Sequence, residues 1–232
     1  MAIYVMSDVH GESDRFRKIL KYIHFSSDDV LYIIGDVIDR GDDGILLLRE
    51  IMDQSNMKLI LGNHELMFLN ATARNASLME VQSWIWNGGE VTLKAFQMLD
   101  RVEKNKIRHF LECCPDHASV TVHDTDCYYL VHGWPGSSTY ERCWKHPPCG
   151  INSKNPITGK KLIVGHTIIL RLHTENSIEQ GRCIERMLEK NEHLRISKSS
   201  DFIAIDCGCG HFDIPVRRLS CLRLDDGKVF YA

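Results

Sequence analysis

The chain has 232 residues, and its 44% hydrophobic and 25% charged content is typical of soluble globular proteins. A formal net charge of −3 argues against a nucleic-acid partner bound through phosphate neutralisation. No segment approaches the ~18 apolar residues that span a bilayer, and the first residues carry no basic leader. We therefore expect a single cytoplasmic domain over residues 1–232, with neither a nucleic-acid nor a membrane partner.

The cysteine content is high, with nine residues. No Cys-x-x-Cys pair occurs among them, so a zinc ribbon is not indicated. In a reducing compartment we expect most of them to act as small buried hydrophobic residues. The sequence leaves the oligomeric state open.

The first third of the chain alternates between strand and helix patterns. Apolar runs at residues 2–6, 30–34 and 57–61 predict strands. Between them, a helix capped by Ser13 and a second helix over residues 44–52 are predicted from apolar spacing. This β-α-β-α-β order predicts parallel strands with right-handed crossovers.

Polar residues follow each of these three strands. In open α/β sheets, ligands bind beyond the carboxyl ends of the strands, so three strands would deliver their polar residues to one edge. The segment after the second predicted strand is Gly35-Asp36-x-x-Asp39-Arg40-Gly41. It combines two carboxylates and a guanidinium between two glycines, which suits a cation site that also holds an anion. The polar residues at the three ends are Asp8, His10, Asp36, Asp39, Arg40, Asn63, His64 and Glu65.

The next block, residues 66–115, has helical patterns and no strand pattern. We predict helices over 78–86, 91–102 and 104–114, with Asn87-Gly88-Gly89 as a helix stop. This block is expected to form a helical cap beside the polar edge. Its two tryptophans are expected to serve packing: Trp84 and Trp86.

The second half has a mostly β pattern. Two of its strands end at His132-Gly133 and Gly165-His166, so it also delivers histidines just past strand ends. Asp124-Thr125-Asp126 and Asp225-Asp226-Gly227 are predicted turns. The predicted strands are residues 119–123, 127–131, 161–164, 202–205, 219–224 and 229–231, with a helix around 177–190 and a loop over 147–160.

The collected strand ends form a set of metal-type ligands. Carboxylate, imidazole and amide oxygen together suit first-row divalent metals such as manganese, iron or zinc. One metal uses three or four of these groups, so a set of six indicates two, and a pair ~3.5–4 Å apart clamps a phosphoryl group. A bridging carboxylate is then needed, and Asp36 has the natural mid-sheet position. The six candidates are Asp8, His10, Asp36, Asn63, His132 and His166.

These motifs resemble the signature of the calcineurin-like metallophosphoesterases, and more narrowly the phosphoprotein phosphatases in their compact bacterial and phage form. The matching motifs follow the family's order from residue 8 to residue 166. The trailing Asp206-Cys207-Gly208 resembles the family's usual ending more weakly. The motifs are Asp8-x-His10-Gly11, Gly35-Asp36-x-x-Asp39-Arg40-Gly41, Gly62-Asn63-His64-Glu65, His132-Gly133 and Gly165-His166.

The resemblance implies a mixed α/β, four-layer fold with a central β-sandwich flanked by helices. It also implies a dinuclear centre of two divalent metal ions, with manganese expected and iron or zinc as alternatives, whose bound hydroxide attacks phosphorus. His64 would protonate the leaving oxygen, Asp39 would orient His64, and Arg40 would hold phosphate oxygens. The implied ligands are Asp8, His10 and His166 for the first metal, Asn63 and His132 for the second, and Asp36 for both.

The chain departs from the protein phosphatases at Leu61, where that family often has an arginine. The symmetrical diadenosine tetraphosphatases, a sister group, resemble the chain here because they have an apolar residue. They usually read Gly-Asn-His-Asp, however, so Glu65 matches the protein phosphatases. A further family arginine should fall between the two late histidines; Arg142 is the candidate, although Trp144-Lys145-His146 also resembles its place.

Three functions remain as hypotheses, and the first, above all as a serine/threonine protein phosphatase, is the main one. The first is a metal-dependent phosphomonoesterase acting on serine/threonine phosphoproteins or on small phosphoesters. The second is a hydrolase of dinucleoside polyphosphates such as diadenosine tetraphosphate. The third is an inactive phosphatase fold used as a binding module, which the presence of every expected ligand disfavours.

Overall fold

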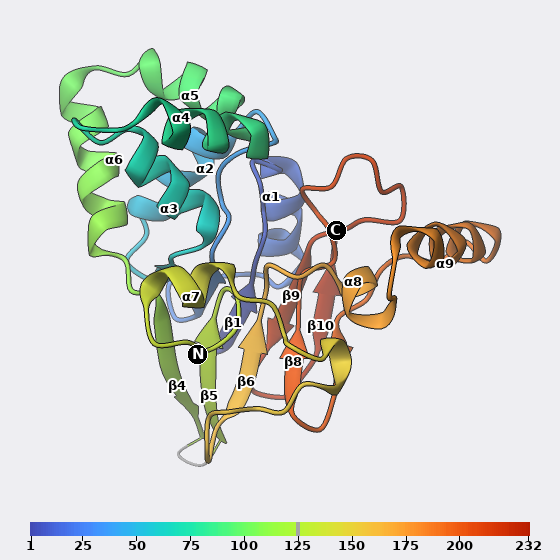
Figure 1. Ribbon diagram of the computed structural model, residues 1–232. Helices are drawn as coiled ribbons and strands as arrows, with labels where there is room; N and C mark the ends of the chain where they lie inside the picture. Colours follow the sequence, from blue (N-terminus) through green and yellow to red (C-terminus); the bar gives the residue numbers. More distant parts are fainter. Residues whose placement is uncertain (124–125) are drawn as a thin grey trace.

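Two five-stranded sheets form the centre of the computed structural model, which describes residues 1–123 and 126–232 (Figure 1). The first sheet has the order β10-β9-β1-β2-β3 and the second the order β4-β5-β6-β8-β7. The strands are β1 (Ile3–Met6), β2 (Val30–Ile34), β3 (Met57–Ile60), β4 (His117–Val122), β5 (Asp126–Val131), β6 (Lys161–Val164), β7 (Ser197–Lys198), β8 (Phe202–Ala204), β9 (Ser220–Arg223) and β10 (Val229–Tyr231).

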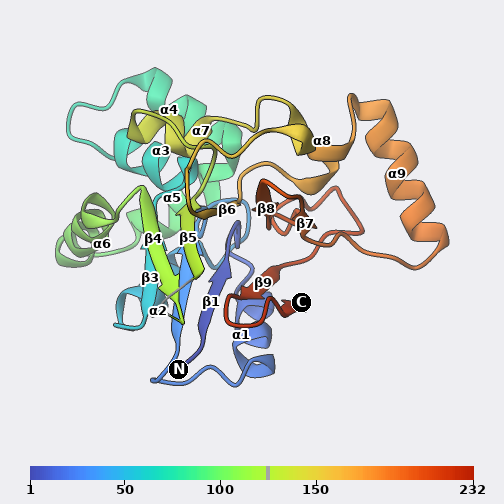
Figure 2. The same cartoon turned by 90° about the horizontal axis from the view of Figure 1, so that it is seen from below.

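Helices gather in a block at one end of the sheets, while α9 projects away from them in both views (Figures 1 and 2). No helix in the described ranges is both long and apolar enough to cross a bilayer. The helices are α1 (Ser13–Tyr22), α2 (Gly44–Met52), α3 (Asn63–Ala71), α4 (Leu78–Trp84), α5 (Glu90–Gln97), α6 (Arg101–Cys113), α7 (Thr139–Trp144), α8 (Ile169–His173) and α9 (Ser177–Glu189), with a π-turn η1 (Ile85–Gly89) and a 3₁₀ turn η2 (Gly150–Asn152).

The predicted parallel arrangement of the first three strands is confirmed. Strand β2 pairs in parallel with β1 on one side and with β3 on the other. In the second sheet, β6 likewise pairs in parallel with β5 and with β8. Each sheet therefore brings the carboxyl ends of three strands to one edge, and this topology positions the polar residues.

The hydrophobic core has three parts, which give the fold its four layers. One part lies between the sheets, where Val5 and Ile34 of the first sheet meet Leu130 and Ile163 of the second. The other two parts join the outer face of each sheet to its helices. Full burial of one such side chain contributes about 1.5–3 kcal/mol, so the sandwich is a firm base for the loops at its edge. The predicted four-layer mixed α/β fold with its helical cap is confirmed.

Two helix boundaries differ from the sequence-based prediction. Helix α1 has Glu12 at its N-cap position, and Ser13 is its first residue. The Ser13 hydroxyl donates to Asp43 instead of capping the helix. The break after α5 comes before residue 101 rather than after residue 102, because the Asp100 carboxylate accepts from Glu103 N at 2.8 Å and caps α6.

Two short helices, α7 and α8, were not predicted from sequence. The final hairpin of β9 and β10 is confirmed, and so are the strand patterns that became β4, β5, β6 and β8. The predicted turn at Asp124-Thr125-Asp126 lies largely outside the described residues, because the description resumes at Asp126, the first residue of β5.

Candidate metal centre

The six predicted ligands come together where the strands of both sheets end. Asp8 and His10 follow β1, Asp36 follows β2, and Asn63 begins α3 just after β3. His132 follows β5 and His166 follows β6. Five of the six side chains are buried and His166 is partly buried. Asp36 lies at the centre, because its Oδ2 is 3.6 Å from His10 Nε2 and 3.2 Å from His132 Nε2.

Each ligand histidine turns one ring nitrogen toward a backbone carbonyl. A carbonyl only accepts hydrogen bonds, so in the neutral ring this nitrogen carries the proton and the other has a free lone pair. That is the usual second contact of a metal-bound histidine. The pairs are His10 Nδ1 with Ile38 O at 3.0 Å, His132 Nδ1 with Ile34 O at 2.8 Å, and His166 Nε2 with Trp144 O at 3.2 Å.

The charges of the site also fit a bound cation. Burial and the nearby charge of Asp206 raise the pKa of Asp8 well above its usual range. Burial, helped by the charge of His132, lowers the pKa of His166 to about 3, so this imidazole is neutral at neutral pH. A divalent cation would relieve the repulsion between the buried carboxylates and would use the neutral imidazole as a ligand.

The donor atoms are close enough to share ions. The ligand atoms of His10, Asp36 and His64 lie within 4.8 Å of one another, and so do those of Asp36, His132 and His166. Asn63 Oδ1 is 2.9 Å from His132 Nε2, so it belongs to the second group. In His64, Nδ1 faces Asp39 and Nε2 lies 3.1 Å from Arg40 Nη2. A nitrogen that faces a guanidinium is poorly placed to bind a cation, so the residues fit two divalent ions held without His64.

His64 is instead held by a buried carboxylate. Its Nδ1 lies 2.7 Å from Asp39 Oδ2, and both side chains are fully buried. The same oxygen accepts from Trp84 Nε1 at 2.8 Å, and Asp39 N donates to Thr92 Oγ1 at 3.0 Å. Asp39 is therefore fixed from the helical cap, and it fixes the ring of His64 with Nε2 toward the ligands.

Glu65 holds the Asp36 loop in place. Its buried carboxylate accepts from Asp36 N and Val37 N, both at 2.8 Å, and from Gly62 N at 3.0 Å. Close approach of the two loops requires Gly62, because a Cβ there would lie 2.2 Å from Asp36 Oδ1. Glu65 belongs to the Gly62-Asn63-His64-Glu65 motif. Its bonds to the backbone N–H groups of Asp36, Val37 and Gly62 show that it holds the shape of the Asp36 loop.

The loops of the site have an unusual backbone. Six residues other than glycine adopt left-handed conformations here, with φ between 48° and 72°. Such residues are uncommon, and each costs on the order of 1 kcal/mol or more, so the surrounding bonds must hold them. Arg40 is one example, because its N–H donates to Gly88 O at 2.9 Å. The six are Asp8, His10, Asp36, Asp39, Arg40 and His166.

This arrangement agrees with a comparison against protein families. The model of the calcineurin-like phosphoesterases matches residues 1–196 of the chain. The chain belongs to this family. The family implies divalent metal ions, and the aspartate and histidine groups described above could hold them.

Several curated proteins are similar to parts of this chain. A symmetrical bis(5'-nucleosyl)-tetraphosphatase of Haemophilus ducreyi is 30% identical over 134 residues, which are 57% of this chain and 44% of that protein. Serine/threonine-protein phosphatase 1 of Salmonella typhimurium is 36% identical over 89 residues, 38% of this chain and 39% of that protein. The match therefore spans less than half the length of each of these relatives.

Solved structures support the fold. The crystal structure of a putative diadenosine tetraphosphatase aligns with a TM-score of 0.59 and 14% identity, covering 100% of this chain and 92% of that one. A protein serine/threonine phosphatase from Saccharomyces cerevisiae aligns with a TM-score of 0.61 and 13% identity, covering 100% and 79%. At these identities the likeness concerns the fold alone.

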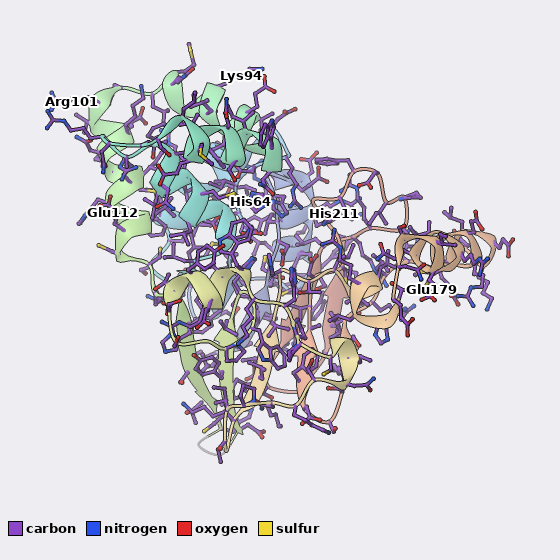
Figure 3. All side chains as sticks on the ribbon, viewed as in Figure 1. His64, Lys94, Arg101, Glu112, Glu179 and His211 are labelled. Carbon is purple, nitrogen blue, oxygen red and sulfur yellow. The ribbon has the colours of Figure 1, made fainter. Side chains whose placement is uncertain are left out.

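A cavity of about 210 Å³ is lined by four of the six predicted ligands, namely Asp8, Asp36, Asn63 and His166. In Figure 3, His64 and His211 both lie where the helical block meets the sheets. A larger groove of about 960 Å³ lies between α8 and α9 and contains none of the predicted ligands. The cavity also includes residues to which the sequence analysis gave no role: Asn87, Trp144, His146, Arg171, Asp206 and His211.

Arg142, expected to hold phosphate, is not among the residues that line this cavity. Its Nη2 lies 2.8 Å from Asp116 Oδ2, and its Nη1 donates to Gly136 O at 2.6 Å. Its guanidinium is thus already used in a partly buried ion pair that joins α7 to the start of β4. The expected phosphate contact stays a prediction, and these two bonds favour a structural role for Arg142.

Replacing Arg142 with alanine should therefore lower stability and leave substrate binding unchanged. Loss of the pair should reduce the free energy of unfolding by about 1–2 kcal/mol, measured by urea denaturation. The KM for p-nitrophenyl phosphate should stay at the wild-type value, whereas Arg40→Ala, the matched variant inside the cavity, should raise it. A raised KM in Arg142→Ala would return this residue to the substrate site.

Proposed function

We propose that the protein hydrolyses dinucleoside polyphosphates with two divalent metal ions, of which manganese is the expected one. The observation that carries this proposal is the apolar residue Leu61, two positions before the predicted ligand Asn63. Leu61 is only 6% exposed, and its backbone N–H donates to Pro115 O at 2.8 Å. The place where protein phosphatases of this family often have an arginine is therefore apolar and buried, as the resemblance to the diadenosine tetraphosphatases implies.

Glu65 was the main sequence feature in favour of a protein phosphatase. Its carboxylate is fully buried and is occupied by three backbone N–H groups. A residue without access to the cavity does not select between substrates directly. With this argument removed, Leu61 remains as the sequence feature that supports the dinucleotide substrate.

The curated relatives support the same choice. Among those most similar to this chain, symmetrical bis(5'-nucleosyl)-tetraphosphatases recur in several bacteria. One from Delftia acidovorans is 41% identical over 73 residues, which are 31% of this chain and 26% of that protein. Because the matched part is short, the substrate of this chain is our proposal.

The proposed reaction uses the residues in three groups. Asp8, His10 and His166 would hold one ion, Asn63 and His132 the other, and Asp36 would contact both. When bound, such a pair stabilises charge on a phosphoryl group and supplies a nucleophile from water near neutral pH. Arg40, at the rim of the cavity, is placed to bind phosphate oxygens through charge-assisted hydrogen bonds.

His64 would serve as the general acid. Asp39 accepts from Nδ1–H, so Nε2 would be the nitrogen that gives a proton to the departing phosphate oxygen. Arg40 Nη2, which lies 3.1 Å from Nε2, would have to turn from this nitrogen to the phosphate. A symmetrical cut of a dinucleoside tetraphosphate would release two nucleoside diphosphates.

A serine/threonine protein phosphatase is the second candidate. It is favoured by the 36% identity to serine/threonine-protein phosphatase 1 of Salmonella typhimurium over 89 residues. Both candidates need the same metal ligands and the same acid. They differ in the leaving group, which is a nucleoside diphosphate in one and a serine or threonine hydroxyl in the other.

Rates on two substrates would separate the candidates. We expect kcat/KM for diadenosine tetraphosphate to exceed that for a phosphoserine peptide by at least about tenfold, or ~1.4 kcal/mol in transition-state binding, with the same manganese concentration in both assays. The Asp36→Asn variant, measured in parallel, controls for contaminating phosphatases. A preference for the peptide would reject the proposed substrate and favour the second candidate.

A further inference from the structure

Two arginines line the cavity over the ligands, and they come from opposite sides of the fold. Arg40 belongs to the loop after β2, a strand of the first sheet. Arg171 belongs to α8, the short helix that follows His166 at the end of β6 in the second sheet. Arg142, the sequence-based candidate for the second phosphate contact, is instead paired with Asp116. Arg171 therefore lines the cavity although it belongs to none of the sequence motifs.

The Arg171 guanidinium is available to a ligand. Its side chain is exposed, and it forms no hydrogen bond or ion pair with any residue that the structure describes. Arg142, in contrast, is held by Asp116. A cation that lines a cavity without an anionic partner is suited to an anionic ligand, and a guanidinium pairs with phosphate through two parallel N–H bonds.

The helix that carries Arg171 is firmly anchored. Ile169, Leu170 and Leu172 are at most 7% exposed, and all three belong to the hydrophobic core on the outer face of the second sheet. Ile169 N also donates to Asp206 O at 3.1 Å, which ties α8 to the end of β8. Arg171 is thus an exposed side chain on a firmly packed helix, and it lines the same cavity as four of the predicted metal ligands.

His211 lines the same cavity as Arg40 and Arg171. Burial lowers the pKa of His211; Asp206 opposes this change, while Arg40 and Arg171 both add to it. His211 lies 3.5 Å from Arg40 Nη1 through its Nε2. His211 is therefore within electrostatic reach of both guanidiniums.

We propose that Arg171 binds the phosphate adjacent to the one held by Arg40, so that the site recognises a chain of two or more phosphates. This inference rests on the proposed dinucleotide substrate and names the residue that selects it. A lone phosphomonoester would use the metal ligands and Arg40 only. A polyphosphate chain would extend from them toward α8 and would engage Arg171 as well.

The first test compares two substrates in the Arg171→Ala variant. We expect kcat/KM for diadenosine tetraphosphate to fall by ~10–100-fold, the usual loss of one or two hydrogen bonds to a charged group, mainly through a higher KM. The rate on p-nitrophenyl phosphate should change little, and Arg171→Lys should recover part of the loss. The control is Arg182→Ala on α9, an arginine that lines the neighbouring groove, which should behave as wild type on both substrates.

The second test measures binding without turnover of the dinucleotide. ADP carries two phosphates and AMP one, so each is used as a competitive inhibitor of p-nitrophenyl phosphate hydrolysis at fixed manganese. Wild type should bind ADP more tightly than AMP, and Arg171→Ala should lose this difference while its inhibition by AMP is unchanged. An equal loss for ADP and AMP would overturn the proposal, because Arg171 would then bind any phosphate.

The outcomes for the two proposals are distinguishable. If wild type prefers the phosphopeptide, the proposed substrate fails, and the comparison of ADP with AMP still decides the role of Arg171. If wild type prefers the dinucleotide but Arg171→Ala keeps that preference, only the inference about Arg171 fails. Equal thermal midpoints of wild type and variant would exclude misfolding as the cause of any loss.

Discussion

Replacing Asp36 with asparagine should lower kcat more than any other single change in this protein. Asp36 Oδ2 is the atom that both groups of candidate ligands share. An amide has one oxygen and no charge, so it cannot serve two cations. Loss of a residue that only supports a metal ligand typically costs ~10–100-fold in activity or metal affinity, and loss of the shared ligand should exceed that range.

Metal content and folding should be measured in the same Asp36→Asn sample. We expect elemental analysis to show less bound manganese, with the far-UV circular dichroism of wild type. The matched control is Asp42→Asn, since Asp42 lies in the same loop and is exposed. Wild-type turnover by Asp36→Asn would show that the two ions, or the bridge between them, have been placed incorrectly.

Replacing His64 with asparagine is the second large change that we expect. A general acid typically contributes ~10²–10⁴-fold to the rate, so kcat should fall by that order while bound metal stays at the wild-type amount. The effect should depend on the leaving group. Phenyl phosphate, whose leaving oxygen needs a proton more than that of p-nitrophenyl phosphate does, should lose more activity.

A histidine outside the site provides the control for this change. His24 is exposed, and its left-handed backbone, with φ of 50°, suits asparagine. His24→Asn should keep wild-type rates on both aryl phosphates. Equal losses on the two substrates in His64→Asn would argue against proton donation and would favour a role in binding phosphate.

The ligand set was accessible from sequence because of a topological rule. Parallel strands joined by helices carry their carboxyl ends to one edge, so residues directly after predicted strands must meet. Asp8, Asp36 and Asn63 follow three such strands. The apolar runs before them are short and clear, and this clarity is why both the fold and the position of the site could be predicted.

Contacts between distant segments could not be predicted in this way. The pairing of Arg142 with Asp116 crosses 26 residues and depends on where the unpredicted helix α7 lies. Helix α8 was missed because its five residues follow an apolar segment directly, so Arg171 had no assigned place. Burial of single residues in the helical cap was also hard to predict. Trp84 and Trp86 were both expected to pack, but only Trp84 is fully buried, and Trp86 is 83% exposed.

The left-handed residues have a consequence for anyone who engineers this protein. Asparagine and glycine adopt that backbone more easily than aspartate, histidine or arginine do. At Asp8 or Asp36, replacement by asparagine or glycine would also remove a buried carboxylate. Without bound metal, the fold has to accommodate the charge of that carboxylate. A library screened for heat resistance without metal would therefore enrich substitutions at the positions that catalysis requires. Directed evolution should instead score survival and turnover together, or keep manganese present throughout.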